Sequence, residues 1–148
     1  KIMYRSKYFT LYEMTFSGNA LKNKIKNEPG PEELEHIKEL LPILDTLREK
    51  WGKPIRISSG YRNPQVNALA GGAKNSAHLT GYAADIKPYN NDMNGFMKVA
   101  REWVKTLDGY DEFLEEYGAD GGHWLHFALK SIKGLQRKKN GIIDKRKK

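Results

Sequence analysis

Two histidines and one aspartate of this sequence could together hold a catalytic zinc ion: His78, Asp85 and His126. His78 ends a polar loop, and Asp85 lies in the short apolar segment that follows, so a turn near Gly81 can bring their side chains together. Imidazole and carboxylate are both zinc ligands, and three protein ligands leave a fourth tetrahedral position open for water. Since the chain has no cysteine, a zinc site in it has to use such ligands. The competing interpretation is three unrelated residues, namely a buried histidine, a capping aspartate and a surface glutamate.

The choice of His126 over His123 depends on strand alternation in residues 123–129, whose sequence is HWLHFAL. Alternate residues of a strand share a face. The leucine and phenylalanine positions of this segment therefore form a core face, and His126 lies on the opposite face beside Trp124 and a small alanine. We expect a half-buried ligand at His126, whereas His123 at the strand entrance is expected to be exposed.

Hydrolysis at such a site also needs a general base that takes a proton from water. Glu115 and Glu116 are the candidates, because they lie in the segment that we expect to pair with residues 123–129. The spacing alone does not choose between them.

The elements that must position these residues predict an α+β fold, with a small antiparallel sheet and helices packed on one side of it. Apolar residues at helical spacing predict helices over residues 32–51 and 93–107; Pro42 is expected to kink the first, and Gly52 ends it. His36 is expected on the surface of that helix. Strands are predicted over residues 53–59, 83–87, 111–117 and 123–129, and a long functional loop with one short helix over residues 60–82.

Charge divides the chain into a single domain over residues 1–129 and a basic tail over residues 130–148. The tail holds nine Lys or Arg and one Asp, which accounts for the net charge of +8, while the body is neutral. We expect the tail to be flexible and able to bind anionic envelope polymers. A neutral body gives no support to a specific nucleic-acid-binding surface.

No stretch approaches the ~18 apolar residues that a transmembrane helix requires. The first residues, KIMY, lack the apolar region of a signal peptide, and the chain does not begin with Met. The route by which it would leave the cytoplasm therefore stays open.

Three separated segments resemble the zinc D-Ala-D-Ala carboxypeptidase family, which includes phage L-alanoyl-D-glutamate endolysins and is similar in structure to hedgehog signalling domains. The resemblance rests on residues 51–55, 57–64 and 71–86, and on later elements as far as Leu129. The family pattern Ser-x-His-x-x-Gly-x-Ala-x-Asp, then Glu, then Trp-x-His, is matched in order by Ser76, His78, Gly81, Ala83, Asp85, Glu116, Trp124 and His126.

The resemblance implies a role for each matched residue. His78, Asp85 and His126 would bind one zinc ion per chain, and Glu116 rather than Glu115 would be the base. Arg62 would hold a substrate carboxylate or the developing oxyanion, and Ser76 and Trp124 would contact the substrate. The departures are Ala77, Tyr82 and Glu112, the last of which stands where the family has Gln; they are expected to alter the pocket wall.

The expected function is zinc-dependent hydrolysis of amide bonds in peptidoglycan stem peptides, by a D-Ala-D-Ala carboxypeptidase or a phage-type endolysin. Such an enzyme would act in the periplasm or cell wall, and we expect a monomer. The alternative is a catalytically silent module of the same fold that binds wall peptide or forms part of a virion. The retained Glu116 argues against that alternative, since a pure binder needs no base.

Overall fold

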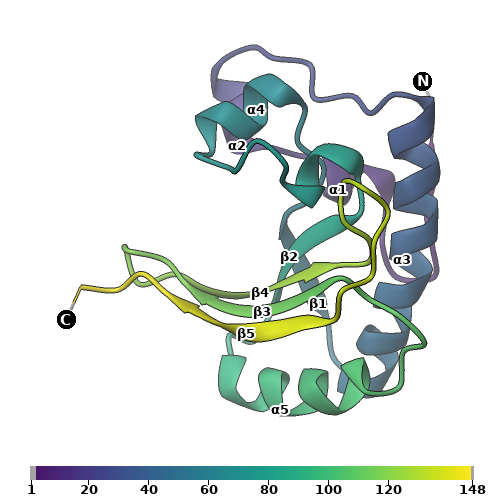
Figure 1. Ribbon diagram of the computed structural model, residues 1–148, viewed down its shortest axis with the longest axis vertical. Helices are drawn as coiled ribbons and strands as arrows, with labels where there is room; N and C mark the ends of the chain where they lie inside the picture. The colour runs from purple at the N-terminus through teal and green to yellow at the C-terminus, as the bar shows by residue number, and fades with distance from the viewer. Residues whose placement is uncertain (1–2, 148) are drawn as a thin grey trace.

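A five-stranded sheet with the strand order β1-β2-β4-β3-β5 forms the centre of the fold in this computed structural model, which describes residues 3–147 (Figure 1). The strands are β1 (Ile55–Ser59), β2 (Ala83–Pro88), β3 (Glu112–Tyr117), β4 (His123–Ala128) and β5 (Lys139–Asp144). The first four pair antiparallel, and β5 pairs parallel with β3. The predicted α+β class is confirmed.

The helices follow local sequence signals closely. They are α1 (Leu11–Thr15), α2 (Gly18–Lys22), α3 (Pro31–Trp51), α4 (Pro64–Leu69), the 3-10 helix η1 (Ala77–Thr80) and α5 (Met93–Val104). Pro31 opens α3, where a missing N–H costs nothing. Gly52 ends α3 in the left-handed conformation, at φ 74°. Pro42 lies on the exposed side of α3, and the helix continues past it.

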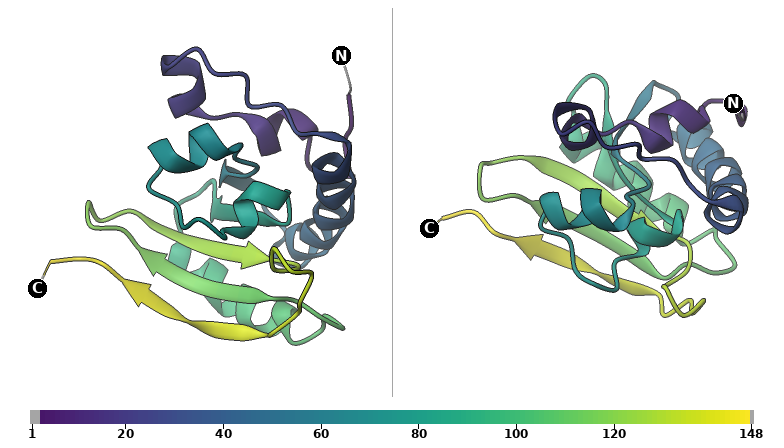
Figure 2. Two further views of the ribbon diagram at one scale, coloured as in Figure 1. Left: turned by 45° about the horizontal axis from the view of Figure 1, so that its top comes forward. Right: turned by 90° about the horizontal axis from the view of Figure 1, so that it is seen from above.

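The two long helices, α3 and α5, cover one face of the sheet. The main hydrophobic core lies between these helices and that face. Leu125 and Phe127 of β4 point into this core, where the ring of Phe127 lies 5.0 Å from that of Trp103 in α5. The short elements α4 and η1 lie over the other face (Figures 1 and 2). There Ala77 of η1 packs against Ala83 and a small residue of β4. We expected all helices on one side of the sheet. The short helices α4 and η1 instead lie on the other side, because the segment between β1 and β2 returns across the sheet (Figures 1 and 2).

The segment expected to be a flexible tail supplies the edge strand β5 instead. Arg137 anchors the loop that leads into it: its backbone N–H, Nε and Nη2 donate to the carboxylate of Asp111 at 3.0, 2.8 and 2.8 Å. Asp111 is fully buried. The charged sequence KNGIID carries no strand pattern of its own, so β5 depends on pairing with β3 rather than on local propensity.

His36 is half-buried rather than on the surface. Its Nδ1 donates to the backbone oxygen of Thr80 at 2.7 Å, and its ring stacks on Tyr82 at a centroid distance of 4.0 Å. These contacts join α3 to the end of η1, which explains why a histidine among charged neighbours is covered. Across residues 3–147, none of the helices combines the length and the apolar character that spanning a bilayer requires.

Candidate metal centre

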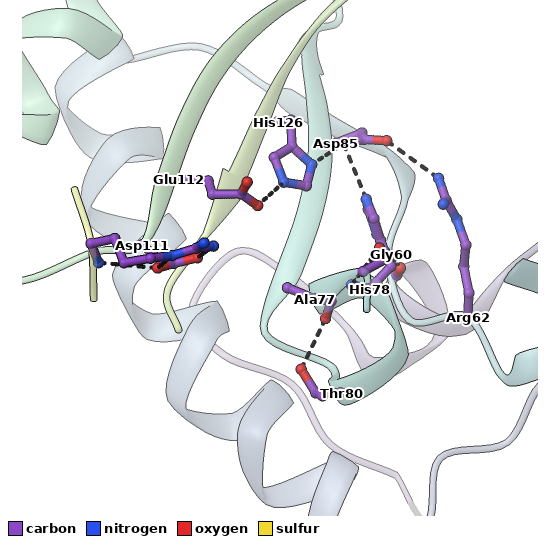
Figure 3. Close-up of polar contacts among 11 residues, drawn as sticks. Gly60, Arg62, Ala77, His78, Thr80, Asp85, Asp111, Glu112 and His126 are labelled. Atoms are coloured by element: carbon purple, nitrogen blue, oxygen red, sulfur yellow. Dashed lines mark hydrogen bonds and ion pairs between the residues drawn. The ribbon is translucent and has the colours of Figure 1, made fainter. Parts of the chain in front are cut away.

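The structure brings His78, Asp85 and His126 together on the sheet face under η1 (Figure 3). One potential ligand atom from each residue lies within 4.8 Å of the others, and all three residues are buried. His78 Nε2 lies 3.3 Å from Asp85 Oδ1, and His126 Nδ1 lies 2.9 Å from the same oxygen. Asp85 and His126 are direct partners in the β2–β4 ladder, so the sheet register itself places them side by side.

His78 is delivered by the short helix η1, which is fixed at both ends. The Ser76 side chain caps it by accepting from the backbone N–H of His78 at 3.2 Å. Gly81 ends it at φ 85°, and a Cβ there would come within 2.7 Å of the backbone oxygen of Glu33 in α3. Only glycine suits that approach, so η1 rests directly on α3.

The tautomer of His78 is set by the backbone. Its Nδ1 lies 2.7 Å from the carbonyl oxygen of Gly60, which can only accept, so Nδ1 carries the proton and the lone pair of Nε2 could bind a metal ion. Gly60 in turn lies against α1, where a Cβ would collide with the backbone of Met14. The N–H of Tyr61 donates to that same backbone at 2.6 Å, which holds the Gly60 carbonyl in place.

His126 is held at both nitrogens. Nδ1 faces Asp85, and Nε2 donates to Glu112 Oε1 at 3.0 Å. Burial alone would lower the pKa of His126, but hydrogen bonds to these two carboxylates raise it to about 10. A carboxylate behind a ligating imidazole is a common outer contact in zinc sites. Glu112 therefore does more than line the pocket wall.

Arg62 lies beside the cluster, with Nη2 3.6 Å from Asp85 Oδ2. Its Nε donates to Ser59 Oγ at 3.0 Å, which fixes the guanidinium in this position. Burial would raise the pKa of Asp85, but the two histidines hold it well below the usual range. Asp85 thus offers one oxygen to the histidines and the other to Arg62, and the predicted substrate contact of Arg62 would be made from this position.

The two candidate bases lie on opposite faces of β3. Glu116 faces the metal cluster, because it pairs with Trp124 and lies two residues from Leu114, the partner of His126. Burial raises the pKa of Glu116, as suits a proton acceptor. Glu115 is buried on the far face, where it accepts from Arg101 Nη2 at 2.6 Å and from a histidine.

That histidine is His123, which is half-buried rather than exposed as expected. Its Nε2 lies 2.8 Å from Glu115 Oε2, and its ring stacks on Tyr117 at 4.0 Å. The alternation that separates it from His126 is as expected, but the sequence did not show that Glu115 would cover it. His123 takes no part in the cluster.

The remaining site residues lie near the cluster with other contacts. Ser76 is the cap of η1, where its hydroxyl oxygen accepts from the backbone N–H of His78. Trp124 faces the same side as Glu116, and its indole lies against Gly118 and Gly122, where an added Cβ would come within 3.2 Å. Its Nε1 is buried and has no hydrogen-bond partner within residues 3–147.

The contact missed by the sequence reasoning is that of Glu112 with His126. A signal for it existed: Glu112 has the same parity as Glu116 on β3, so strand alternation places both on the metal face.

Comparison with known proteins connects this geometry to peptidases. The family model described as Peptidase M15 matches residues 7–115. Zinc D-Ala-D-Ala carboxypeptidase of Streptomyces albus G is 31% identical over 88 residues, which make up 55% of this chain and 34% of that protein. The similarity thus spans about a third of the relative's length. The matched range contains His78 and Asp85 and ends before Glu116 and His126.

Proposed function

Since the chain belongs to the peptidase M15 family, we propose that it is a zinc-dependent peptidase that cleaves amide bonds in the stem peptides of peptidoglycan. The observation that carries the proposal is the buried group of two histidines and one aspartate, with Glu116 on the same sheet face. The similarity to a zinc D-Ala-D-Ala carboxypeptidase supports both the metal and the substrate class. An enzyme with this substrate acts in the periplasm or cell wall.

The residues present suit zinc. His78 Nε2, Asp85 Oδ1 and His126 Nδ1 would hold it, because these atoms converge and the other ring nitrogens are occupied by Gly60 and Glu112. When bound, zinc polarises a carbonyl group and lowers the pKa of water. Two imidazoles and one carboxylate match the ligand sets of catalytic zinc sites, which keep a position open.

Glu116 is the proposed general base. Its carboxylate would take a proton from the attacking water and pass that proton to the nitrogen of the departing amine. Burial raises its pKa and so makes it a better acceptor than an exposed glutamate. Glu115 is excluded from this task by its position on the far face, where Arg101 and His123 occupy its oxygens.

Arg62 is proposed to hold negative charge of the substrate or of the transition state. Its Nη2 is 3.6 Å from Asp85, which is a long contact, and the guanidinium has five donors. It can therefore keep Asp85 oriented and still donate to an oxygen next to the metal. Ser76 and Trp124 complete the proposed substrate contacts.

Incubation of the zinc-loaded protein with purified muropeptides, followed by mass spectrometry of the products, tests the proposal. Loss of a terminal D-Ala would identify a carboxypeptidase, and separated stem fragments would identify an endolysin-type endopeptidase. The Glu116→Gln variant, loaded with zinc to the same content, is the control. Intact muropeptides after incubation with fully loaded wild-type protein would refute the proposed activity and favour a wall-peptide-binding module.

A further inference from the structure

The edge strand β5 extends the sheet face that carries the metal cluster. Its register with β3 pairs Lys139 with Glu112 and Ile143 with Glu116, and a glycine lies between them opposite Leu114. Neighbouring residues in register share a face of the sheet. Lys139 and Ile143 therefore lie on the same side as Glu112 and Glu116. In Figures 1 and 2, β5 is the yellow strand that borders this face.

Lys145 continues the same face just beyond the end of β5. Its backbone N–H donates to the carbonyl oxygen of Tyr117 at 2.9 Å, so the ladder with β3 extends this far. The next residue, Arg146, lies over the ring of Tyr117 at 3.8 Å, on the face away from the cluster. Since successive side chains alternate, Lys145 points to the cluster side. Its charge also acts on Glu116, whose pKa it lowers against the larger effect of burial.

The charges of the site make these two lysines available to a ligand. Asp85, Glu112 and Glu116 carry three negative charges, which Arg62 and a divalent zinc ion would balance. Within residues 3–147, neither Lys139 nor Lys145 is in a salt bridge with a carboxylate; their charges act at longer range, that of Lys139 on Glu112 and that of Lys145 on Glu116. The β5 border of the face thus carries two lysines that have no salt-bridge partner among the described residues, with Gly141 and Ile143 between them.

We propose that Lys139 and Lys145 form a cationic rim of the substrate site, which recognises a carboxylate of the peptide on the β5 side of the scissile bond. The inference rests on the proposed peptidase function and adds a preference to it: acidic peptides are favoured over their amidated counterparts. A lysine ammonium suits this task, because it is a point charge on a long flexible stem. Ile143, between the lysines, would contact the apolar part of the same residue.

The test compares two synthetic stem peptides that are identical except that the acidic side group is a carboxylate in one and a carboxamide in the other. Each lysine substitution is made in two proteins. Dissociation constants of the peptides are measured in zinc-loaded protein that also carries Glu116→Gln, and kcat/KM values are measured in protein that keeps Glu116. For exposed charges about 6–7 Å apart, Coulomb's law predicts that Lys145→Ala lowers the affinity for the carboxylate peptide roughly threefold and that Lys145→Glu lowers it roughly tenfold. The affinity for the carboxamide peptide should not change. The preference should also weaken at high ionic strength.

Lys98→Glu is the matched control, since it makes the same charge change on an exposed position of α5, which covers the opposite face. It should leave the preference intact. Equal binding of the two peptides by the parent protein, or an unchanged preference in Lys145→Glu, would overturn the inference. A binding preference that depends on Lys145 without hydrolysis of either peptide would support the rim and refute the peptidase. Hydrolysis of both peptides at equal rates would support the peptidase and refute the rim.

Discussion

The Arg137→Ala variant should have a lower free energy of unfolding than the wild type, because Asp111 would lose its main hydrogen-bond partner. Asp111 is fully buried, while the Arg137 side chain that reaches it is 44% exposed. Two side-chain hydrogen bonds of 2.8 Å would disappear, and the backbone N–H at 3.0 Å would remain. Hydrogen bonds to a charged group contribute about 1.5–3 kcal/mol each, and breaking a buried ion pair costs about 3–5 kcal/mol. Water entering at the exposed guanidinium position reduces this, so we expect a loss of about 2–3 kcal/mol.

The loss of stability in Arg137→Ala should be large at neutral pH and should decrease as the pH falls. In the wild type, burial raises the pKa of Asp111, but Arg137 outweighs it and holds the pKa below the usual value. That stabilisation is present above the unfolded pKa of about 3.9 and is lost as the pH falls through the folded value. In Arg137→Ala, burial would dominate and the pKa of Asp111 would rise, so the penalty would be present at neutral pH and vanish on acidification. The difference in unfolding free energy between the two proteins should therefore shrink as the pH falls from neutral toward and below the unfolded pKa of Asp111.

Urea unfolding followed by tryptophan fluorescence at several pH values measures this difference. Arg146→Ala is the control, since Arg146 makes a similar two-bond contact with Asp144, whose side chain is 29% exposed. Exposed pairs contribute about 0–1 kcal/mol, so that variant should be near wild type. A difference below about 1 kcal/mol for Arg137→Ala at pH 7, or one that is equal at pH 7 and pH 4, would refute the reasoning.

Substitutions at four further positions test the site. Glu116→Gln should keep its zinc but lose turnover by a factor of at least about 100, and wild-type rates would remove Glu116 from its role. His78→Ala should lose zinc, as stoichiometry by mass spectrometry will show; a full complement would exclude it as a ligand. Glu112→Ala should weaken zinc binding by about 10–100-fold in a chelator competition, with Glu112→Gln much closer to wild type. Gly81→Ala should lower the unfolding midpoint, since φ is 85° there and α3 leaves no space for a Cβ; an unchanged midpoint would show that η1 can move away from α3.

The sequence allowed prediction of what depends on local periodicity. The apolar spacing of residues 32–51 predicted α3 to within one residue at its start. In β4, alternation separated His126 from His123, and the structure places the two on opposite faces of the sheet. These succeed because the side-chain direction in a helix or strand follows from residue number alone.

What could not be predicted depends on contacts between distant segments. β5 has no strand pattern and exists because residues 139–144 pair with β3 after Arg137 reaches Asp111. His36 and His123 are covered by partners 44 and 8 residues away in the chain, which no periodicity reveals. Residues 130–147 were expected to form a flexible tail, but their removal would expose the edge of β3 and leave Asp111 buried without its guanidinium partner.

Each proposed zinc ligand is oriented by a contact on the side away from the metal. The Gly60 carbonyl holds His78, Glu112 holds His126, and Arg62 lies against the second oxygen of Asp85. The three contacting groups differ in charge: the carbonyl is neutral, the carboxylate is negative and the guanidinium is positive. A neutral carbonyl fixes only the direction of an imidazole, whereas the Glu112 carboxylate also adds electron density to it, and the Arg62 cation withdraws charge from Asp85. Because Glu112 and Arg62 act on the metal in opposite senses, replacing Glu112 by Gln should move the site toward weaker metal binding even though the hydrogen bond can be kept. A small loss of zinc affinity in Glu112→Gln, beside the large loss in Glu112→Ala, would separate the charge of this residue from its geometry.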